Sequence, residues 1–191
     1  MPRPKFQLIV IGVSSGGMQA LKIILGQLPA EFPLPLLVVQ HISSDAGDGL
    51  ARLLDELCEI RVKEADEQDR ICAGTAYLAP ANYHLLVESD GILALSADPP
   101  VSYARPSIDV LFESASAVYS SALIGVVLTG ANFDGSQGLK TIKQNGGIAI
   151  VQNPADAAAP QMPLAALAAT AVDYVAPLDG IVAVLKKLAD A

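Results

Sequence analysis

The chain has 191 residues, a formal net charge of −8 and a pI near 4.6. This length is typical of one compact domain with its own core, and a 52% share of hydrophobic residues excludes a disordered chain. The acidic balance argues against nucleic acid as a partner, because that affinity comes from clustered lysines and arginines that neutralise phosphates.

Cysteine use and the amino terminus bear on the cellular compartment. The chain holds 2 cysteines, Cys58 and Cys72, and neither lies in a ligand spacing such as C-x-x-C. We therefore expect no metal site and no disulfide framework, as in a reducing cytosol. The apolar segment Leu8 to Ile11 is shorter than the core of a signal peptide, and no stretch could cross ~30 Å of hydrocarbon. The sequence predicts a cytoplasmic protein without membrane insertion.

The first part of the chain alternates between buried strands and amphipathic helices. Gln7 to Ile11 predicts a strand, and the turn Gly12 to Gly17 leads from it into a helix that ends at Pro29. Leu34 to Gln40 predicts a second buried strand, followed by a helix with the apolar stripe Leu50 to Leu57. This rhythm is typical of βαβ units. The apolar positions of the first helix are Met18, Leu21, Ile24, Leu25 and Leu28.

Residues 60–104 depart from this pattern. Three short strand-like pieces occur there without helices between them, at Tyr77 to Ala79, Leu85 to Glu88 and Ile92 to Ser96. The tripeptide Ser89-Asp90-Gly91 is a hairpin signal between the last two pieces. We expect this region to form an antiparallel insertion.

Alternation resumes after this insertion and continues to the end of the chain. The elements together predict one domain over residues 1–191 with a three-layer α/β/α fold. Its sheet is expected to be doubly wound and mostly parallel, with the antiparallel hairpin as an insertion. The expected elements are a helix over Ser107 to Tyr119, a strand over Leu123 to Leu128, a helix over Gly135 to Gln144, a strand over Ile148 to Gln152, a helix over Leu164 to Thr170, a strand over Val172 to Val175 and a last helix from Asp179.

The turn after the first strand carries a candidate nucleophile. Gly12-Val13-Ser14-Ser15-Gly16 matches G-x-S-x-G at the strand-to-helix junction where a nucleophile elbow belongs. Glycines on either side of Ser14 allow a sharp turn that exposes the serine oxygen. Two other interpretations remain open: a turn that packs strand on helix, or one that cradles a phosphate at the helix amino terminus. Ser15 occupies the x position, so we expect a supporting role for it.

A serine nucleophile needs a base that is poised near neutral pH, and histidine is the usual choice. The chain has 2 histidines, His41 and His84. His41 follows the second buried strand directly, which places it at the carboxyl edge of the sheet beside Ser14 if the two strands are neighbours. His84 starts a hairpin strand instead. His41 is therefore the candidate base.

The third group of such a site is a carboxylate that fixes the imidazole tautomer. Asp134 lies in the loop Thr129 to Gly135, which follows the strand over Leu123 to Leu128. An aspartate before glycine at a helix start is otherwise an N-cap, and this alternative stays open. Carboxyl ends of parallel strands meet at one edge of a sheet, so the three candidates are expected to converge there.

The order Ser, His, Asp along the chain differs from the order of α/β-hydrolases, which disfavours that family. An acyl-transfer site also needs donors for the oxyanion. The backbone N–H of Ser15 is the first candidate, and the loop of Gly130, Ala131 and Asn132 offers a possible second donor.

Several motifs in order resemble the catalytic domain of CheB-type protein-glutamate methylesterases. They span nearly the whole chain. The motifs are Ile11-Gly12-Val13-Ser14-Ser15-Gly16-Gly17, Gln40-His41, Arg105-Pro106-Ser107-Ile108-Asp109-Val110-Leu111-Phe112 and Leu128-Thr129-Gly130-Ala131-Asn132-Phe133-Asp134-Gly135.

The resemblance implies hydrolysis of glutamyl methyl esters on chemoreceptors, often alongside deamidation of glutamines. It places the catalytic residues of the family on Ser14, His41 and Asp134, and it implies no metal or organic cofactor. The family commonly has Met-Gly where this chain has Ala131-Asn132, which alters the wall of the acyl pocket. Family members usually carry a receiver domain before the catalytic domain, and the sequence predicts a chain without one, either an excised domain or, as Met1 favours, a stand-alone relative.

Two alternatives remain open at this point. The glycine-rich turn could belong to a non-catalytic anion- or nucleotide-binding module in which His41 and Asp134 are structural. The enzyme could also be an esterase whose substrate is not a chemoreceptor, because Ala131-Asn132 and the missing receiver domain both loosen the link to chemotaxis.

Overall fold

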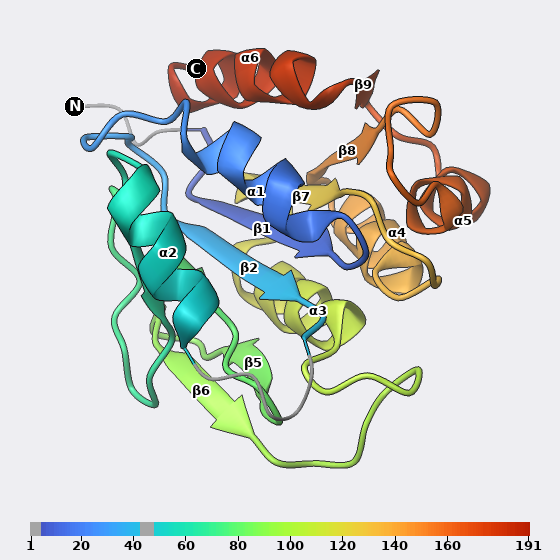
Figure 1. The fold of residues 1–191 in the computed structure, drawn as a ribbon. Coiled ribbons are helices and arrows are strands. Elements are labelled where there is room, and N and C mark those ends of the chain that lie inside the picture. The colour runs from blue at the N-terminus through green and yellow to red at the C-terminus, as the bar shows by residue number, and fades with distance from the viewer. Residues whose placement is uncertain (1–4, 43–47) are drawn as a thin grey trace.

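A computed structural model describes residues 5–42 and 48–191, which leaves Met1 outside these ranges. A seven-stranded sheet lies between two layers of helices (Figure 1), and neighbouring strands are all parallel in the order β3-β4-β2-β1-β7-β8-β9. The predicted three-layer fold is confirmed. The strands of this sheet are β1 (Leu8–Val13), β2 (Leu36–Gln40), β3 (Arg61–Glu64), β4 (Thr75–Leu78), β7 (Leu123–Val127), β8 (Ile148–Gln152) and β9 (Tyr174–Ala176).

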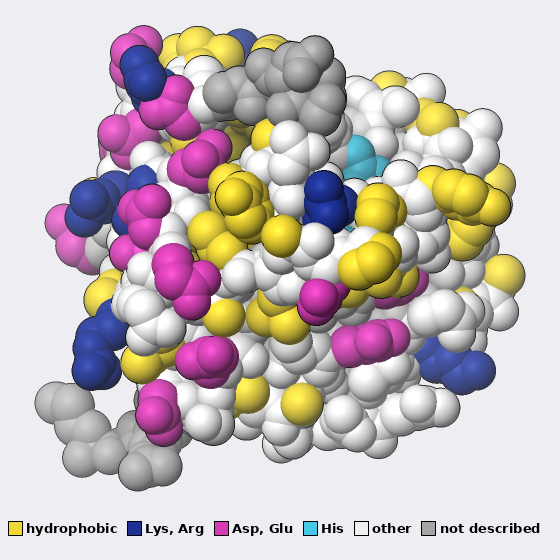
Figure 2. All heavy atoms as spheres, turned by 90° about the horizontal axis from the view of Figure 1, so that it is seen from below, with side chains coloured by type: hydrophobic (Ala, Val, Ile, Leu, Met, Phe, Trp, Pro, Cys, Tyr) yellow, Lys and Arg dark blue, Asp and Glu magenta, His cyan; other side chains and the backbone are white. Residues whose placement is uncertain are grey.

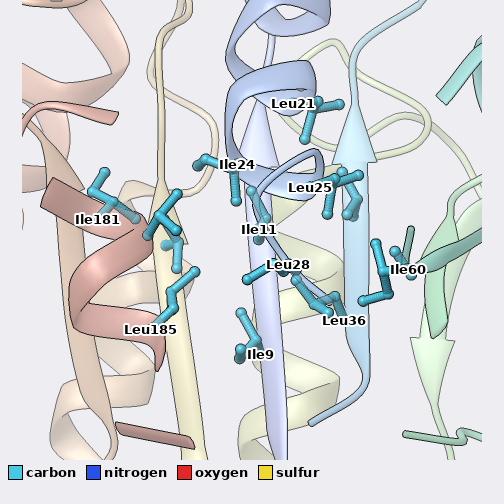
Figure 3. Packing of buried hydrophobic residues seen from close by; sticks show 14 of the residues in the cluster. Ile9, Ile11, Leu21, Ile24, Leu25, Leu28, Leu36, Ile60, Ile181 and Leu185 are labelled. Atoms are coloured by element: carbon cyan, nitrogen blue, oxygen red, sulfur yellow. The ribbon is translucent and has the colours of Figure 1, made fainter. Parts of the chain in front are cut away.

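Helices cover both faces of the sheet, so its central strands are buried on both sides and read as continuous apolar runs. On one face, Ile9 and Ile11 of β1 belong to the same core cluster as Leu21 and Ile24 of the first helix (Figure 3), whereas Leu8 belongs to the opposite core. The first face carries α1 (Gly17–Leu25), α2 (Gly49–Leu57) and α6 (Leu178–Ala189); the second carries α3 (Ile108–Tyr119), α4 (Ser136–Gln144) and α5 (Gln161–Ala169), and η1 (Ser120–Ala122) precedes β7.

The expectation for residues 60–104 is only partly right. The antiparallel hairpin exists, formed by β5 (His84–Val87) and β6 (Leu93–Ser96) around the predicted turn. However, β4 is not antiparallel: it enters the main sheet between β2 and β3 and is parallel to both. Strand β3 was not predicted, because it lies at the edge of the sheet and is rich in charged residues. Its sequence is RVKE, and only the valine is buried.

Two helix boundaries also differ from expectation. Helix α1 ends at Leu25, and Met18, expected on its buried stripe, is 51% exposed. Helix α5 begins at Gln161 rather than Leu164, because Pro163 lies in the first turn, where no intrahelical N–H is required.

The strand order reverses between β1 and β7, which creates a crevice at their carboxyl ends. The chain leaves β1 toward β2 and later returns to β7 on the opposite side of β1. Ser14 follows β1, His41 follows β2 and the loop of Asp134 follows β7. The fold thus brings all three candidate residues to one edge of three adjacent strands. In residues 5–42 and 48–191, no helix is long and apolar enough to span a membrane.

Candidate active site

The three candidate residues are joined by hydrogen bonds that also include Asn132. His41 Nε2 lies 2.8 Å from Asp134 Oδ2, and Asn132 Nδ2 lies 3.1 Å from His41 Nδ1. The same Asn132 nitrogen donates to Ser14 Oγ over 3.4 Å. Within the described part of the chain, no hydrogen bond joins Ser14 Oγ to His41 directly. The structure therefore holds a serine, an imidazole and a carboxylate together, with an amide between the first two.

Asp134 is buried and accepts five hydrogen bonds, of which the shortest measures 2.7 Å. Its Oδ2 accepts from His41 Nε2 and from the Ile108 amide, and its Oδ1 accepts from the Ser107 hydroxyl. The remaining donors are the amides of Asp109, at 3.0 Å, and Gly135, at 3.0 Å. Because two of these donors are first-turn amides of α3, the carboxylate lies at the positive end of that helix.

The alternative interpretation of Asp134 as an N-cap is therefore also realised, but on α3 rather than on the helix that follows it in sequence. One carboxylate can thus cap a helix and orient an imidazole. Burial alone would raise the pKa of Asp134, but hydrogen bonds from His41 and from the amides of Asp109 and Ile108 outweigh burial and hold that pKa below its ordinary 3.8. Asp134 is therefore ionised at neutral pH.

The contact with Asp134 fixes the tautomer of His41. A carboxylate only accepts hydrogen bonds, so His41 Nε2 carries the proton and Nδ1 has the free lone pair. The unprotonated ring nitrogen on the side of Ser14 is thus Nδ1, whereas in the chymotrypsin-type triad the nitrogen that faces the serine is Nε2. The His41 side chain is 17% exposed, which leaves it accessible from the surface.

The turn that carries Ser14 is held at several points. The Ser14 amide donates to Thr129 O over 2.9 Å, and Gln40 Nε2 donates to the carbonyls of Ser14 and His41. Gly16 has a φ of 81°, so the left-handed residue of the turn is this glycine and not Ser14. A Cβ at Gly17 would overlap Gln40 Oε1, which explains the glycine there. The ends of β1, β2 and β7 are thereby tied together.

The structure narrows the choice of oxyanion donors. The amide of Gly130 donates to Ala159 O over 3.0 Å, so it is already used. The amides of Ser15, Ala131 and Asn132 donate no hydrogen bond to any part of the chain that the structure describes. Ser15 and Ala131 are exposed, whereas Gly130 is buried. The donors that a substrate could reach are therefore the amides of Ser15, Ala131 and Asn132.

Sequence reasoning missed the residues that hold Asp134 in place. Ser107, Ile108 and Asp109 lie in a motif quoted for the family resemblance, but their contacts with Asp134 could not be read from it. His84 in turn holds Ser107 in place, because its Nδ1 accepts from the Ser107 amide over 3.1 Å while its Nε2 donates to Pro99 O. His84 is thus a buried structural histidine, in agreement with its exclusion as the base.

A groove of about 720 Å³ runs from this site along α1 and is lined by Ser14, His41, Met18 and Lys22. A neighbouring hollow of about 220 Å³ includes His41 and Arg105. Figure 2, which views the molecule from the side of β5 and β6, shows a small area of histidine surface set mainly among white atoms, with basic and hydrophobic side chains close by. The site is therefore open to a large substrate. Within residues 5–42 and 48–191, no group of three or more His, Cys, Asp or Glu residues is arranged to hold a metal ion.

Comparison with known proteins points to one family. The model of the CheB methylesterase family matches residues 9–185. A protein of Leptospira interrogans, to which protein-glutamate methylesterase and protein-glutamine glutaminase activities are ascribed, is 52% identical over 92% of this chain and 91% of its own length. FrzG of Myxococcus xanthus, named a protein-glutamate methylesterase, is 39% identical over 99% of this chain, which spans 57% of FrzG.

A solved structure agrees with these matches. The crystal structure of the CheB methylesterase catalytic domain of Thermotoga maritima superposes with a TM-score of 0.92 at 33% identity. The alignment covers 96% of this chain and 98% of that domain, so the whole three-layer fold is shared. The fold, the family model and the relatives agree with the resemblance seen in the sequence motifs: this chain belongs to the CheB methylesterase family.

Proposed function

We propose that this chain is a protein-glutamate methylesterase that removes methyl groups from glutamyl methyl esters of chemoreceptors. Ser14 is the nucleophile, His41 the base and Asp134 the orienting carboxylate. The observation that carries this proposal is the 2.8 Å contact of His41 with Asp134, which leaves the Nδ1 lone pair on the side of Ser14. The names of the relatives support the substrate class.

The proposed reaction is acyl transfer in two steps. His41 Nδ1 takes the Ser14 proton as Oγ bonds to the ester carbonyl carbon, and the Ser15 amide donates to the oxyanion. The C–O bond to the methoxy group then breaks, and methoxide leaves as methanol with the proton from His41. Water, deprotonated by His41, attacks the acyl-enzyme, releases the glutamate and restores Ser14. Glutamine deamidation follows the same course with ammonia as the leaving group.

The surroundings of the site support a protein substrate. The groove beside Ser14 is open and partly apolar, and Met18 on its wall is 51% exposed. Lys22 and Arg105 line the two hollows that meet at His41, although the chain as a whole has a net charge of −8. Positive side chains at this position favour a segment rich in glutamate. The phosphate-binding alternative is not favoured, because the family and its named relatives are esterases.

Methanol release from a methylated chemoreceptor tests the proposal. Ser14→Ala should remove release almost completely, because no other group replaces the nucleophile. Ser15→Ala is the matched control: it changes an adjacent exposed serine, retains the backbone N–H and should keep the rate within about threefold. If folded Ser14→Ala released methanol at the wild-type rate, the nucleophile assignment would be wrong. Hydrolysis of small methyl esters without action on the receptor would instead indicate an esterase with another substrate.

A further inference from the structure

Asn132 stands between the two residues that must exchange a proton. We propose that it is a positioning residue whose side-chain amide occupies His41 Nδ1 in the resting site, so that Ser14 reaches the base only after this amide is displaced. This inference rests on the proposed roles of Ser14 and His41. It adds a resting state of the site in which Ser14 does not yet contact His41. No such role was expected from the sequence, which predicted Asn132 as a possible oxyanion donor and as part of the acyl-pocket wall.

The orientation of the Asn132 amide follows from its hydrogen bonds. Asn132 Oδ1 accepts from the Asp134 amide over 2.9 Å, and Nδ2 faces His41 Nδ1 at 3.1 Å. If Oδ1 and Nδ2 were exchanged, the Asn132 NH₂ group would face the N–H of Asp134, and the Asn132 oxygen would face the lone pair of His41 Nδ1. The amide therefore donates to His41.

This donation competes with Ser14. A neutral His41 that gives its Nε2 proton to Asp134 has one lone pair, at Nδ1, and the amide at 3.1 Å uses it. Ser14 Oγ lies 3.4 Å from the same amide nitrogen and has no hydrogen bond to His41. Proton transfer requires Ser14 Oγ within hydrogen-bond reach of the base. The amide must therefore leave Nδ1 before Ser14 can be activated.

The rest of the site allows such a movement. Asn132 is half-buried in a loop and contacts solvent, whereas Asp134 two residues later is 2% exposed and fully hydrogen-bonded. A displaced amide can donate to water instead, because Asn132 is only half-buried. Once His41 is protonated at Nδ1, two donors would face each other there. The resting contact is therefore lost as the reaction proceeds.

Acylation by p-nitrophenyl acetate tests the inference without a receptor. Asn132→Ser should accelerate the pre-steady-state burst at saturating ester by about three- to tenfold, which is the value of one neutral hydrogen bond, with KM unchanged. A serine at this position can still accept from the Asp134 amide as an ST-turn but is too short to reach His41. Asn132→Gly should also accelerate the burst if the loop stays folded. Phe133→Ala, at an adjacent side chain that is 56% exposed, is the control and should leave the burst unchanged.

Slower or unchanged acylation in Asn132→Ser would overturn the inference. A loss of about 100-fold or more would identify the amide as an oxyanion donor, and an unchanged rate would make it structural. Ser14→Ala must be measured alongside. If it still gave a burst, the proposed function would fall together with this inference, whereas slow Asn132→Ser with an inactive Ser14→Ala would refute the inference alone.

Discussion

The two ends of the proposed catalytic chain are built differently. At the acid end, Asp134 accepts five hydrogen bonds and is 2% exposed. At the nucleophile end, the Ser14 hydroxyl has one hydrogen bond with the described residues, of 3.4 Å, and Ser14 is only half-buried. Asp134, which orients His41, is thus held by more hydrogen bonds than its orientation requires, whereas the hydroxyl of the proposed nucleophile is weakly held. A catalytic site of this kind keeps its electrostatics fixed while the nucleophile can adjust to the substrate.

The difference has a structural origin in the helices. Asp134 lies at the amino terminus of α3, where free amides and the helix dipole stabilise a negative charge. The segment around Ser14 is attached through its backbone instead, by Gln40 and Thr129, and its hydroxyl accepts the long hydrogen bond from Asn132. The comparison predicts that changes at the acid end cost both stability and rate.

The largest loss of activity is expected for Asp134→Asn, which changes the carboxylate that accepts five hydrogen bonds. The amide nitrogen of asparagine would face donors at the present carboxylate positions, and the tautomer of His41 would no longer be fixed. We expect kcat for methanol release to fall by about 10⁴-fold, with substrate binding little changed. The melting temperature should fall as well, since α3 loses its charged cap. A variant with normal kcat would show that Asp134 only caps the helix.

Removing one of the donors to Asp134 should have an intermediate effect. Ser107→Ala deletes the hydroxyl that donates to Asp134 Oδ1 over 3.0 Å, leaving four donors in place. A hydrogen bond to a charged group is worth about 1.5–3 kcal/mol, or about 10- to 150-fold, and kcat should fall by a factor near the lower end because four donors remain. Ser89→Ala, at an exposed serine in the turn between β5 and β6, is the control and should behave as wild type. A loss of kcat of more than 1,000-fold would mean that the four remaining donors do not hold Asp134 in place.

The smallest effect is a pH dependence of stability at Asp109. Burial, together with the charges of Asp134 and Glu113, raises the pKa of Asp109 to about 6 from an ordinary 3.8, against the hydrogen bond from the Gly138 amide. Between these values the folded state binds more protons than the unfolded state, so this group makes stability fall as pH rises from about 4 to about 6. Asp134, whose pKa is lowered, acts in the opposite direction, and its contribution is lost as the pH falls.

Asp109→Asn isolates this contribution. The neutral amide can still accept from the Gly138 amide but does not titrate, so the stability of the variant relative to wild type should increase with pH between about 4 and 6 and then level off. Urea denaturation at several pH values measures the difference. A difference that does not change with pH would contradict the proposed ionisation of Asp109 in the folded protein.

Much of this organisation could be predicted from local patterns. Buried runs such as Leu36–Gln40 identify central strands, and polar residues directly after them identify the carboxyl edge. This placement, together with the G-x-S-x-G motif and the choice between two histidines, predicts that Ser14, His41 and Asp134 lie close together. Strand β3 could not be found in this way, because its side chains are mostly charged and it lies at the edge of the sheet.

The contacts within the site were not predictable for a different reason. The donors to Asp134 come from the first turn of α3, and their approach depends on how α3 packs against the sheet rather than on any spacing along the chain. The direction of the Asn132 side chain depends on one backbone hydrogen bond, from the Asp134 amide. Sequence patterns could locate the site but not the hydrogen bonds that distinguish its two ends.

A crystal structure of the enzyme inactivated by a fluorophosphonate would show directly which residue reacts and whether Asn132 moves. We expect a phosphonyl group on Ser14 Oγ, its oxygen bonded to the Ser15 amide, and an Asn132 amide displaced from His41 Nδ1. Asp134 should keep all five of its donors. A phosphonyl group on another residue would refute the assignment of Ser14 as the nucleophile, and a rearranged Asp134 beside an unmoved Asn132 would refute the proposed difference between the two ends of the site.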